Sequence, residues 1–199
     1  MLIDKFPSSI RIDDGFSVEI NTDFRNFIRF ESIMFGNNSL SKKEKVLKVF
    51  NLFSDFVPQT SAEISAYMDG IIDIYRCGKE IKKLNPVIES KQKQLRMPKI
   101  FDFTFDSPYI FAAFIEAYSI DLTQVNMHWY KFKALFDALP SDCQFSKILG
   151  YRGTDITKIK DSDEKQRIIK LQTIYALPKS LTEHDKIAEA GRIFNGEYI

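Results

Sequence analysis

An unusually aromatic stretch in the second half of the chain places the strongest constraint on how this sequence can fold. It runs from Phe101 to Pro140, reads FDFTFDSPYIFAAFIEAYSIDLTQVNMHWYKFKALFDALP, and contains the only tryptophan. Between Tyr109 and Tyr118 only Glu116 is charged. A helix over these residues would be apolar on nearly all sides, and we therefore expect it to be buried.

Two helices fit this stretch. Ser107 followed by Pro108 is typical of a helix N-cap with proline at the first helical position, where the missing N–H costs nothing. After residues 120–123 a second helix would end near Pro140 and carry large apolar side chains on one face: Val125, Trp129, Phe132, Phe136 and Leu139. The pair predicts an aromatic αα-hairpin at the centre of a helical core.

The N-terminal residues predict a small β-element. Residues 8–20 alternate apolar and polar side chains around the Asp13-Asp14-Gly15 turn, in which we expect Gly15 to adopt the left-handed conformation. One face of this hairpin would carry Ile10, Ile12, Phe16, Val18 and Ile20. Because an isolated hairpin is marginally stable in water, we expect a further strand at Ile100–Phe105, where phenylalanines alternate with polar residues.

Helical periodicity follows the hairpin. Thr22 is a candidate cap for a first helix, and two capping boxes, Ser41–Glu44 and Thr60–Glu63, precede a second and a third. The C-terminal half adds helices over 142–149, 161–175 and 181–194. The predicted fold class is mainly α, a helical protein built on the aromatic αα-hairpin with a small N-terminal β-hairpin.

Charge and composition suggest where the chain divides. Net charge is +1, yet residues 76–99 hold eight basic and two acidic side chains. We expect residues 1–78 to form a unit of hairpin and three helices, 79–99 a basic linker, and 100–199 a helical unit, with one continuous domain as the alternative. The 18 phenylalanines indicate an aromatic core, or else apolar surface kept for a partner.

The basic segment 76–99 supports an alternative function, a small nucleic-acid-binding regulatory protein. Its cations could follow phosphates: Arg76, Lys79, Lys82, Lys83, Lys91, Lys93, Arg96 and Lys99. However, no aromatic residues are interleaved to stack on bases, and no reading helix is recognisable. A solvated linker therefore fits the segment better than a nucleic-acid site.

The sequence offers no constellation that indicates catalysis. His128 and His184 are the only histidines, and neither has metal-ligand spacing to another histidine or to Cys77 or Cys143. Phosphate-loop, dinucleotide and nucleophile motifs are absent. Gly150–Gly153 has two readings, an anion-binding loop or a helix end followed by a turn, and the second is favoured. We expect no enzyme, no catalytic or metal residues and no cofactor.

The acidic pairs have structural interpretations. Asp102 and Asp106 suit the outer face of a strand and a helix cap, while Asp161 and Asp163 suit a helix N-terminus. Asp4 and Lys5 stand where a signal peptide would need its apolar stretch, and no apolar run is long enough for a membrane span, so we expect neither a signal peptide nor a membrane partner. The presence of only two cysteines favours a reducing compartment.

Several blocks of the sequence, taken in order, resemble a known family. These are FDFTFDSPYIFAAFIEAYSIDLT, HWYKFKALFDALP, ILGYR and DEKQRIIKLQTIYALP, with weaker likeness at TDFRNFIRFESIMF and SKKEKVLKVFNLF. They are similar to the tail assembly chaperones of tailed bacteriophages of Gram-positive bacteria, encoded before the tape-measure gene. Where that family often has a second tryptophan, this chain has Tyr130.

The resemblance implies a protein that binds the tape-measure protein, keeps it soluble and recruits tail-tube subunits. It would act in the host cell cytoplasm and be absent from the mature virion. We expect self-association or multivalent binding. We do not expect nucleic acid to be a partner. The weak helix over 181–194 is a candidate partner-binding surface through Ile187 and Phe194, with a frayed terminal helix as the alternative.

Overall fold

The structure, a computed structural model, describes residues 5–36, 38–79 and 100–178. Within them the chain is mainly α-helical with one small antiparallel sheet, which confirms the predicted fold class. The elements in order are β1 (Ser9–Arg11), β2 (Ser17–Glu19), α1 (Phe24–Phe35), α2 (Lys42–Phe53), α3 (Ser61–Tyr75), α5 (Ser107–Tyr118), α6 (Trp129–Asp137), α7 (Gln144–Gly153), the 3-10 turn η1 (Ile156–Lys158) and α8 (Ser162–Ile174).

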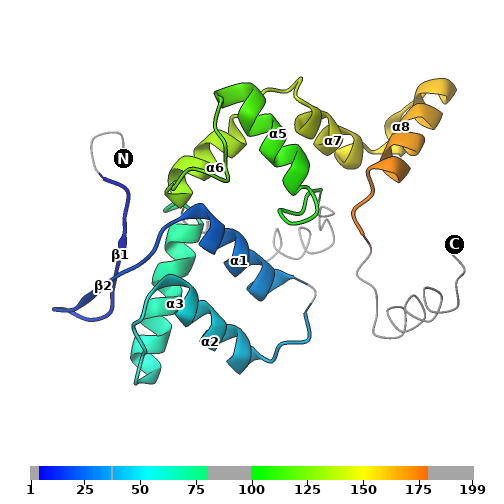
Figure 1. The fold of residues 1–199 in the computed structure, drawn as a ribbon. Helices are drawn as coiled ribbons and strands as arrows, with labels where there is room; N and C mark the ends of the chain where they lie inside the picture. Colours follow the sequence, from blue (N-terminus) through cyan, green and yellow to red (C-terminus); the bar gives the residue numbers. More distant parts are fainter. Residues whose placement is uncertain (1–4, 37, 80–99, 179–199) are drawn as a thin grey trace, which may run out of the picture.

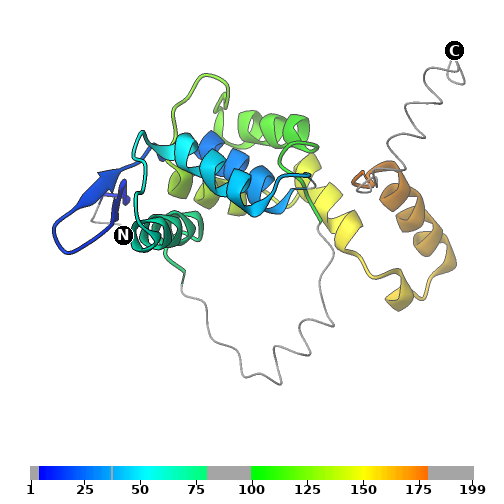
Figure 2. The same cartoon turned by 90° about the horizontal axis from the view of Figure 1, so that it is seen from below.

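The helices form an elongated body. In Figure 1, α5 and α6 lie above α1, α2 and α3, and α7 and α8 continue away to one side. The view from below in Figure 2 places the β1–β2 hairpin and α8 at opposite ends. The core cluster contains residues of α1, α2, α3, α5 and α6.

The hairpin forms with the predicted apolar face but a different turn. Ile10 pairs with Val18, and both are buried, as is Ile20. The expectation that Gly15 is left-handed was wrong, since Gly78 is the only glycine with positive φ in the described part of the chain. The Asp13 carboxylate accepts from the Gly15 N–H at 2.9 Å, and this Asx-type bond closes the loop.

Local capping explains where the first three helices begin. Ser41 and Thr60 form the predicted capping boxes at α2 and α3. Helix α1 is capped by Asp23 instead of Thr22, because the Asp23 side chain accepts the Arg25 N–H at 3.0 Å.

The predicted strand at Ile100–Phe105 was wrong: these residues form turns that lead into α5. The Asp102 carboxylate accepts the N–H groups of Thr104 and Phe105, both at 2.9 Å. These bonds curl the backbone, so Phe103 points into the core while Phe105 stays 46% exposed. Alternation alone could not reveal this, because the side chain of Asp102 competes with strand pairing.

Helix α6 begins later than its apolar pattern predicts. It starts at Trp129, where the His128 ring nitrogen accepts the Tyr130 N–H, and residues 119–128 form an irregular connection after α5. Aromatic rings join the two helices: Phe132 stacks on Phe114 at 5.2 Å between centroids, and the Tyr118 hydroxyl donates to the Leu135 carbonyl.

One hydrophobic core includes residues from both sides of segment 80–99. Tyr75 at the end of α3 stacks on Trp129 of α6 with 5.6 Å between centroids, and the Trp129 indole N–H donates to the Tyr75 carbonyl at 2.8 Å. The cluster extends from Ile10 to Phe145. The predicted unit boundaries near residues 78 and 100 stay a prediction.

A buried ion pair links α5, α7 and the end of α8. Helix α7 continues through Gly153, so the predicted loop at 150–153 is helical, and Arg152 faces the protein instead of an anion. Its guanidinium donates two bonds to the Asp106 carboxylate, at 2.7 and 2.9 Å, and others to the carbonyls of Ile100 and Tyr175. The Asp106 and Arg152 side chains are 0% and 6% exposed.

We predict that this pair is the most sensitive polar contact in the described fold. Arg152→Met keeps most of the aliphatic part of the side chain but leaves the Asp106 carboxylate buried without its ion-pair partner. The free energy of unfolding should therefore fall by about 3–5 kcal/mol. Urea denaturation followed by circular dichroism measures the change.

Arg167→Met provides the matched control. Arg167 pairs with Glu164 on the surface of α8, where both side chains are largely exposed, so its loss should leave the unfolding midpoint unchanged. Equal effects of the two substitutions would contradict the prediction.

Candidate partner-binding groove

The residues that the sequence singled out for partner binding are not described by the structure. Ile187 and Phe194 lie outside the described residues, and of the basic segment 76–99 only Arg76 and Lys79 among its cations lie within them. The predicted C-terminal surface and the basic linker therefore stay predictions.

The described residues contain no group of three His, Cys, Asp or Glu side chains that could bind a metal ion. His128 has a structural role instead, since it caps α6 and its other ring nitrogen bonds to the Pro7 carbonyl at 2.9 Å. Across the same residues, no helix is both long and apolar enough to span a membrane.

An apolar hollow of about 360 Å³ lies between α1 and α5, with α6 beneath it. We call it the α1–α5 groove. Its lining comes from α1 (Phe24, Arg25, Ile28), the turn before α5 (Phe103), α5 (Ser107, Ile110, Phe111), the connection after it (Leu122, Thr123) and α6 (Phe132).

The groove has a rigid aromatic floor and a half-exposed apolar rim. Phe132 is fully buried and stacks on Phe24 with 4.5 Å between centroids and 12° between planes. Ile28 of α1 and Phe111 of α5 are half-buried and lie in opposite walls. One helical turn beyond Phe111, Ile115 is 42% exposed, so the apolar surface of α5 continues past the groove.

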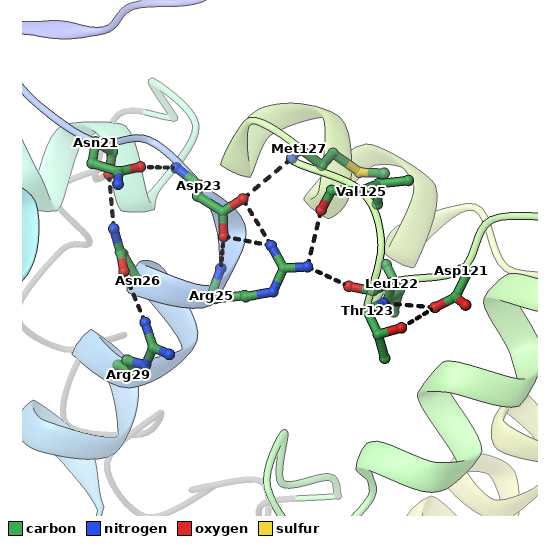
Figure 3. A network of polar contacts seen from close by, with 10 residues as sticks. All are labelled: Asn21, Asp23, Arg25, Asn26, Arg29, Asp121, Leu122, Thr123, Val125 and Met127. Atoms are coloured by element: carbon green, nitrogen blue, oxygen red, sulfur yellow. Dashed lines mark hydrogen bonds and ion pairs between the residues drawn. The ribbon is translucent and has the colours of Figure 1, made fainter.

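A polar network fixes one end of the groove (Figure 3). The Arg25 guanidinium bonds to the Asp23 carboxylate at 3.0 and 3.1 Å and donates to the carbonyls of Leu122 and Val125. The Asp23 carboxylate also accepts the Met127 N–H at 3.3 Å. Charged groups make strong bonds to backbone, so α1 is tied to the connection that carries Leu122.

Backbone bonds strengthen the same junction. The Phe24 N–H donates to the Met127 carbonyl at 2.9 Å, and the Trp129 N–H donates to the Thr22 carbonyl at 2.8 Å. The N-terminus of α1 and that of α6 are therefore fixed to each other, and the groove floor has a defined position relative to its α1 wall.

The lining is suited to binding and not to proton transfer. Among the described residues, Arg25 is the only ionisable side chain that lines the groove, and its guanidinium is a hydrogen-bond donor without an acceptor atom. Two helices over an aromatic floor form the kind of site that receives an apolar helix face. The arrangement can therefore cover apolar side chains of a partner.

Sequence reasoning missed this site. The sequence pattern places Phe132 on the apolar face of a predicted helix, and Phe24 and Ile28 fall within the predicted first helix. The excess of phenylalanine allows for apolar surface kept for a partner, but no local pattern locates that surface at these residues. Arg25 was not singled out, because its partners Leu122 and Val125 lie about a hundred residues away in the chain. A basic side chain in the first turn of a helix, where acidic ones are preferred, was the one available signal.

Comparison with protein families gives a match over most of the chain. The family model described as Bacteriophage Gp15 protein matches residues 2–177 of the chain. Comparisons with curated proteins and with solved structures gave no match.

We predict that Arg25 controls the order of the groove end. Arg25→Met removes the bonds to Leu122 and Val125, and amide hydrogen exchange over residues 121–127 should then accelerate at least about tenfold, the factor expected for a local loss of about 1.4 kcal/mol. Arg29→Met is the control, because Arg29 bonds only to Asn26 of its own helix among the described residues. Similar exchange in both variants would refute the role of Arg25.

Proposed function

The chain belongs to the bacteriophage Gp15 protein family, and we propose that it is a tail assembly chaperone of a phage of Gram-positive bacteria. In this role it binds the tape-measure protein, keeps it soluble and recruits tail-tube subunits. The order and spacing of its aromatic sequence blocks support the assignment, as does a phage family match that extends over most of the chain.

The α1–α5 groove is the observation that carries the proposal. A tape-measure protein is long and helical, so before assembly its apolar helix faces need cover from water. A groove with Phe24, Phe103 and Phe132 at its base and Ile28 and Phe111 at its rim offers that cover. The partner contributes side chains at helical spacing, and the groove buries them one helix face at a time.

The size of the groove fits a reversible contact. A volume of about 360 Å³ lies near the lower end of the range of roughly 300–1,000 Å³ for ligand sites. Each large apolar side chain that it buries contributes about 1.5–3 kcal/mol. Association costs an estimated 4–15 kcal/mol, so a few anchors give a weak contact that tail-tube subunits can displace.

The proposed mode of action is binding without catalysis, and the described residues that line the groove include no carboxylate, histidine or cysteine. Weak contacts suit a chaperone that engages a long partner repeatedly, and self-association would multiply them. We place this activity in the host cell cytoplasm, before the virion is complete.

We predict that groove variants lose chaperone activity. Co-expression with the tape-measure protein should raise the soluble fraction of that protein, and the double substitution Ile28→Asp and Phe111→Asp should abolish the gain because carboxylates in the rim oppose apolar contact. The measurement is the soluble fraction of tape-measure protein after centrifugation.

Leu47→Asp serves as the matched control, because Leu47 is a 51% exposed apolar residue of α2 outside the groove. Circular dichroism verifies that both variants are folded. If the wild-type chain brings no gain in solubility, the chaperone proposal is wrong; if both variants behave alike, the groove is not the contact surface.

A truncation tests the C-terminal expectation separately. Deleting residues 180–199 removes Ile187 and Phe194, while every described residue of the core cluster, from Ile10 to Phe145, is kept. The shortened protein should fold but bind the tape-measure protein, or itself, less well. Size-exclusion chromatography and the solubility assay measure both effects. An unfolded product would place the deleted residues in the core, and unchanged binding would exclude them as a contact surface.

A further inference from the structure

A second hollow, of about 390 Å³, lies beside the end of α3 and combines aromatic walls with positive charge. We call it the α3–α6 hollow. Tyr75, Phe101, Phe103 and Trp129 form its aromatic walls. It is distinct from the α1–α5 groove, with which it shares only Phe103.

The rim of the hollow is cationic. Arg76, Lys79 and Lys133 line it, and Glu31 is the one acidic side chain among the described residues of its lining. Within the described residues neither Arg76 nor Lys79 has an ion-pair partner, whereas Lys133 pairs with Asp137. The Glu31 carboxylate accepts a hydrogen bond from the Tyr75 hydroxyl at 2.9 Å, so it is already bonded to a residue of the wall. Arg76 and Lys79 can therefore form ion pairs with a negatively charged partner.

The segment of chain that joins two residues of the lining is also basic in sequence. The chain leaves the rim at Lys79 and returns at Phe101, and both residues line the hollow. Residues 80–99 between them contain six basic and two acidic side chains.

The titratable groups in the walls do not suggest a reaction. Burial raises the pKa of the Tyr75 hydroxyl, and the negative charge of Glu31 adds to this effect, so Tyr75 stays a neutral donor. Burial likewise raises the pKa of the Cys77 thiol, although Lys133 and Lys79 act in the opposite direction. Cys77 is therefore protonated near neutral pH and is a poor nucleophile.

The aromatic walls favour a peptide over a nucleic acid. Trp129 is 1% exposed, and its ring stacks on Tyr75, Phe27 and Phe132 with interplanar angles of 11°, 22° and 23°. It thus offers no free face on which a base could stack. Phe101 is half-buried and instead suits contact with an aliphatic or aromatic side chain that enters from solvent.

We propose that the α3–α6 hollow binds an acidic peptide segment of a partner protein, with an apolar side chain against Phe101 and carboxylates on Arg76 and Lys79. The apolar contact supplies affinity, and the charges supply orientation and rate of encounter. This site goes beyond the proposed chaperone groove and does not depend on it.

The sole tryptophan provides a specific probe. The full-length protein labelled with ¹⁵N gives one indole N–H signal, from Trp129 in the wall of the hollow. We would titrate it with the blocked hexapeptide DEFDEL, with its charge-reversed counterpart KRFKRL, with DEGDEG, which lacks the apolar residues, and with single-stranded oligo-dT.

The expected result is a saturable shift of the Trp129 indole signal with DEFDEL, weakened by salt, and little or none with KRFKRL or DEGDEG. The double substitution Arg76→Gln and Lys79→Gln should weaken DEFDEL binding about tenfold, as expected for two partly exposed charge contacts. Lys170→Gln, an exposed cation on α8, should leave it unchanged.

Three outcomes would overturn the proposal. KRFKRL could bind as well as DEFDEL, the Arg76 and Lys79 substitutions could leave DEFDEL binding unchanged, or the indole signal could stay still at saturating peptide. Tighter binding of oligo-dT that is lost in the same double variant would replace the peptide site with a nucleic-acid site. None of these results bears on the α1–α5 groove, which the solubility assay tests.

Discussion

The aromatic stack on α6 is the interaction on which the described fold depends. Trp129 contacts Phe27 of α1 and Tyr75 of α3, while Phe132 stacks with Phe24 of α1 and Phe114 of α5. Helix α6 spans nine residues, too few to be stable alone in water, so packing must hold it in place. In return, its rings bring α1, α3 and α5 around a common centre.

The same rings explain why the protein keeps open apolar surface. Because α1 and α5 both pack on Phe132, the ring separates them, and the space above it remains as the α1–α5 groove. The polar junction of Arg25 and Asp23 maintains the opening, since it fixes the connection that carries Leu122 and Thr123. A chain with small residues at these positions could close the gap and lose the site.

Features formed by residues close together in the sequence were predictable, whereas contacts between residues far apart in the sequence were not. The capping boxes at Ser41 and Thr60 involve residues three apart, so the sequence alone identifies them. The turn at residues 100–105 was misread because Phe-x-Phe-x-Phe has the strand period whether or not Asp102 bends the chain. The Asp106–Arg152 pair joins residues 46 apart, and the groove needs the positions of three helices. Neither leaves a pattern in a short window, so both had to come from the structure.

The groove walls come from two separate parts of the chain, and this would couple partner binding to folding. Phe24 and Ile28 precede segment 80–99 in the chain, whereas Phe103, Phe111 and Phe132 follow it. The groove therefore exists only when both parts of the chain are packed together around α6. A partner that binds the groove binds this packed state alone, and mass action then stabilises it by an amount that grows with partner concentration. Under the proposed function, an abundant partner would hold the protein in its binding-competent form, and displacement of the partner would remove that added stability.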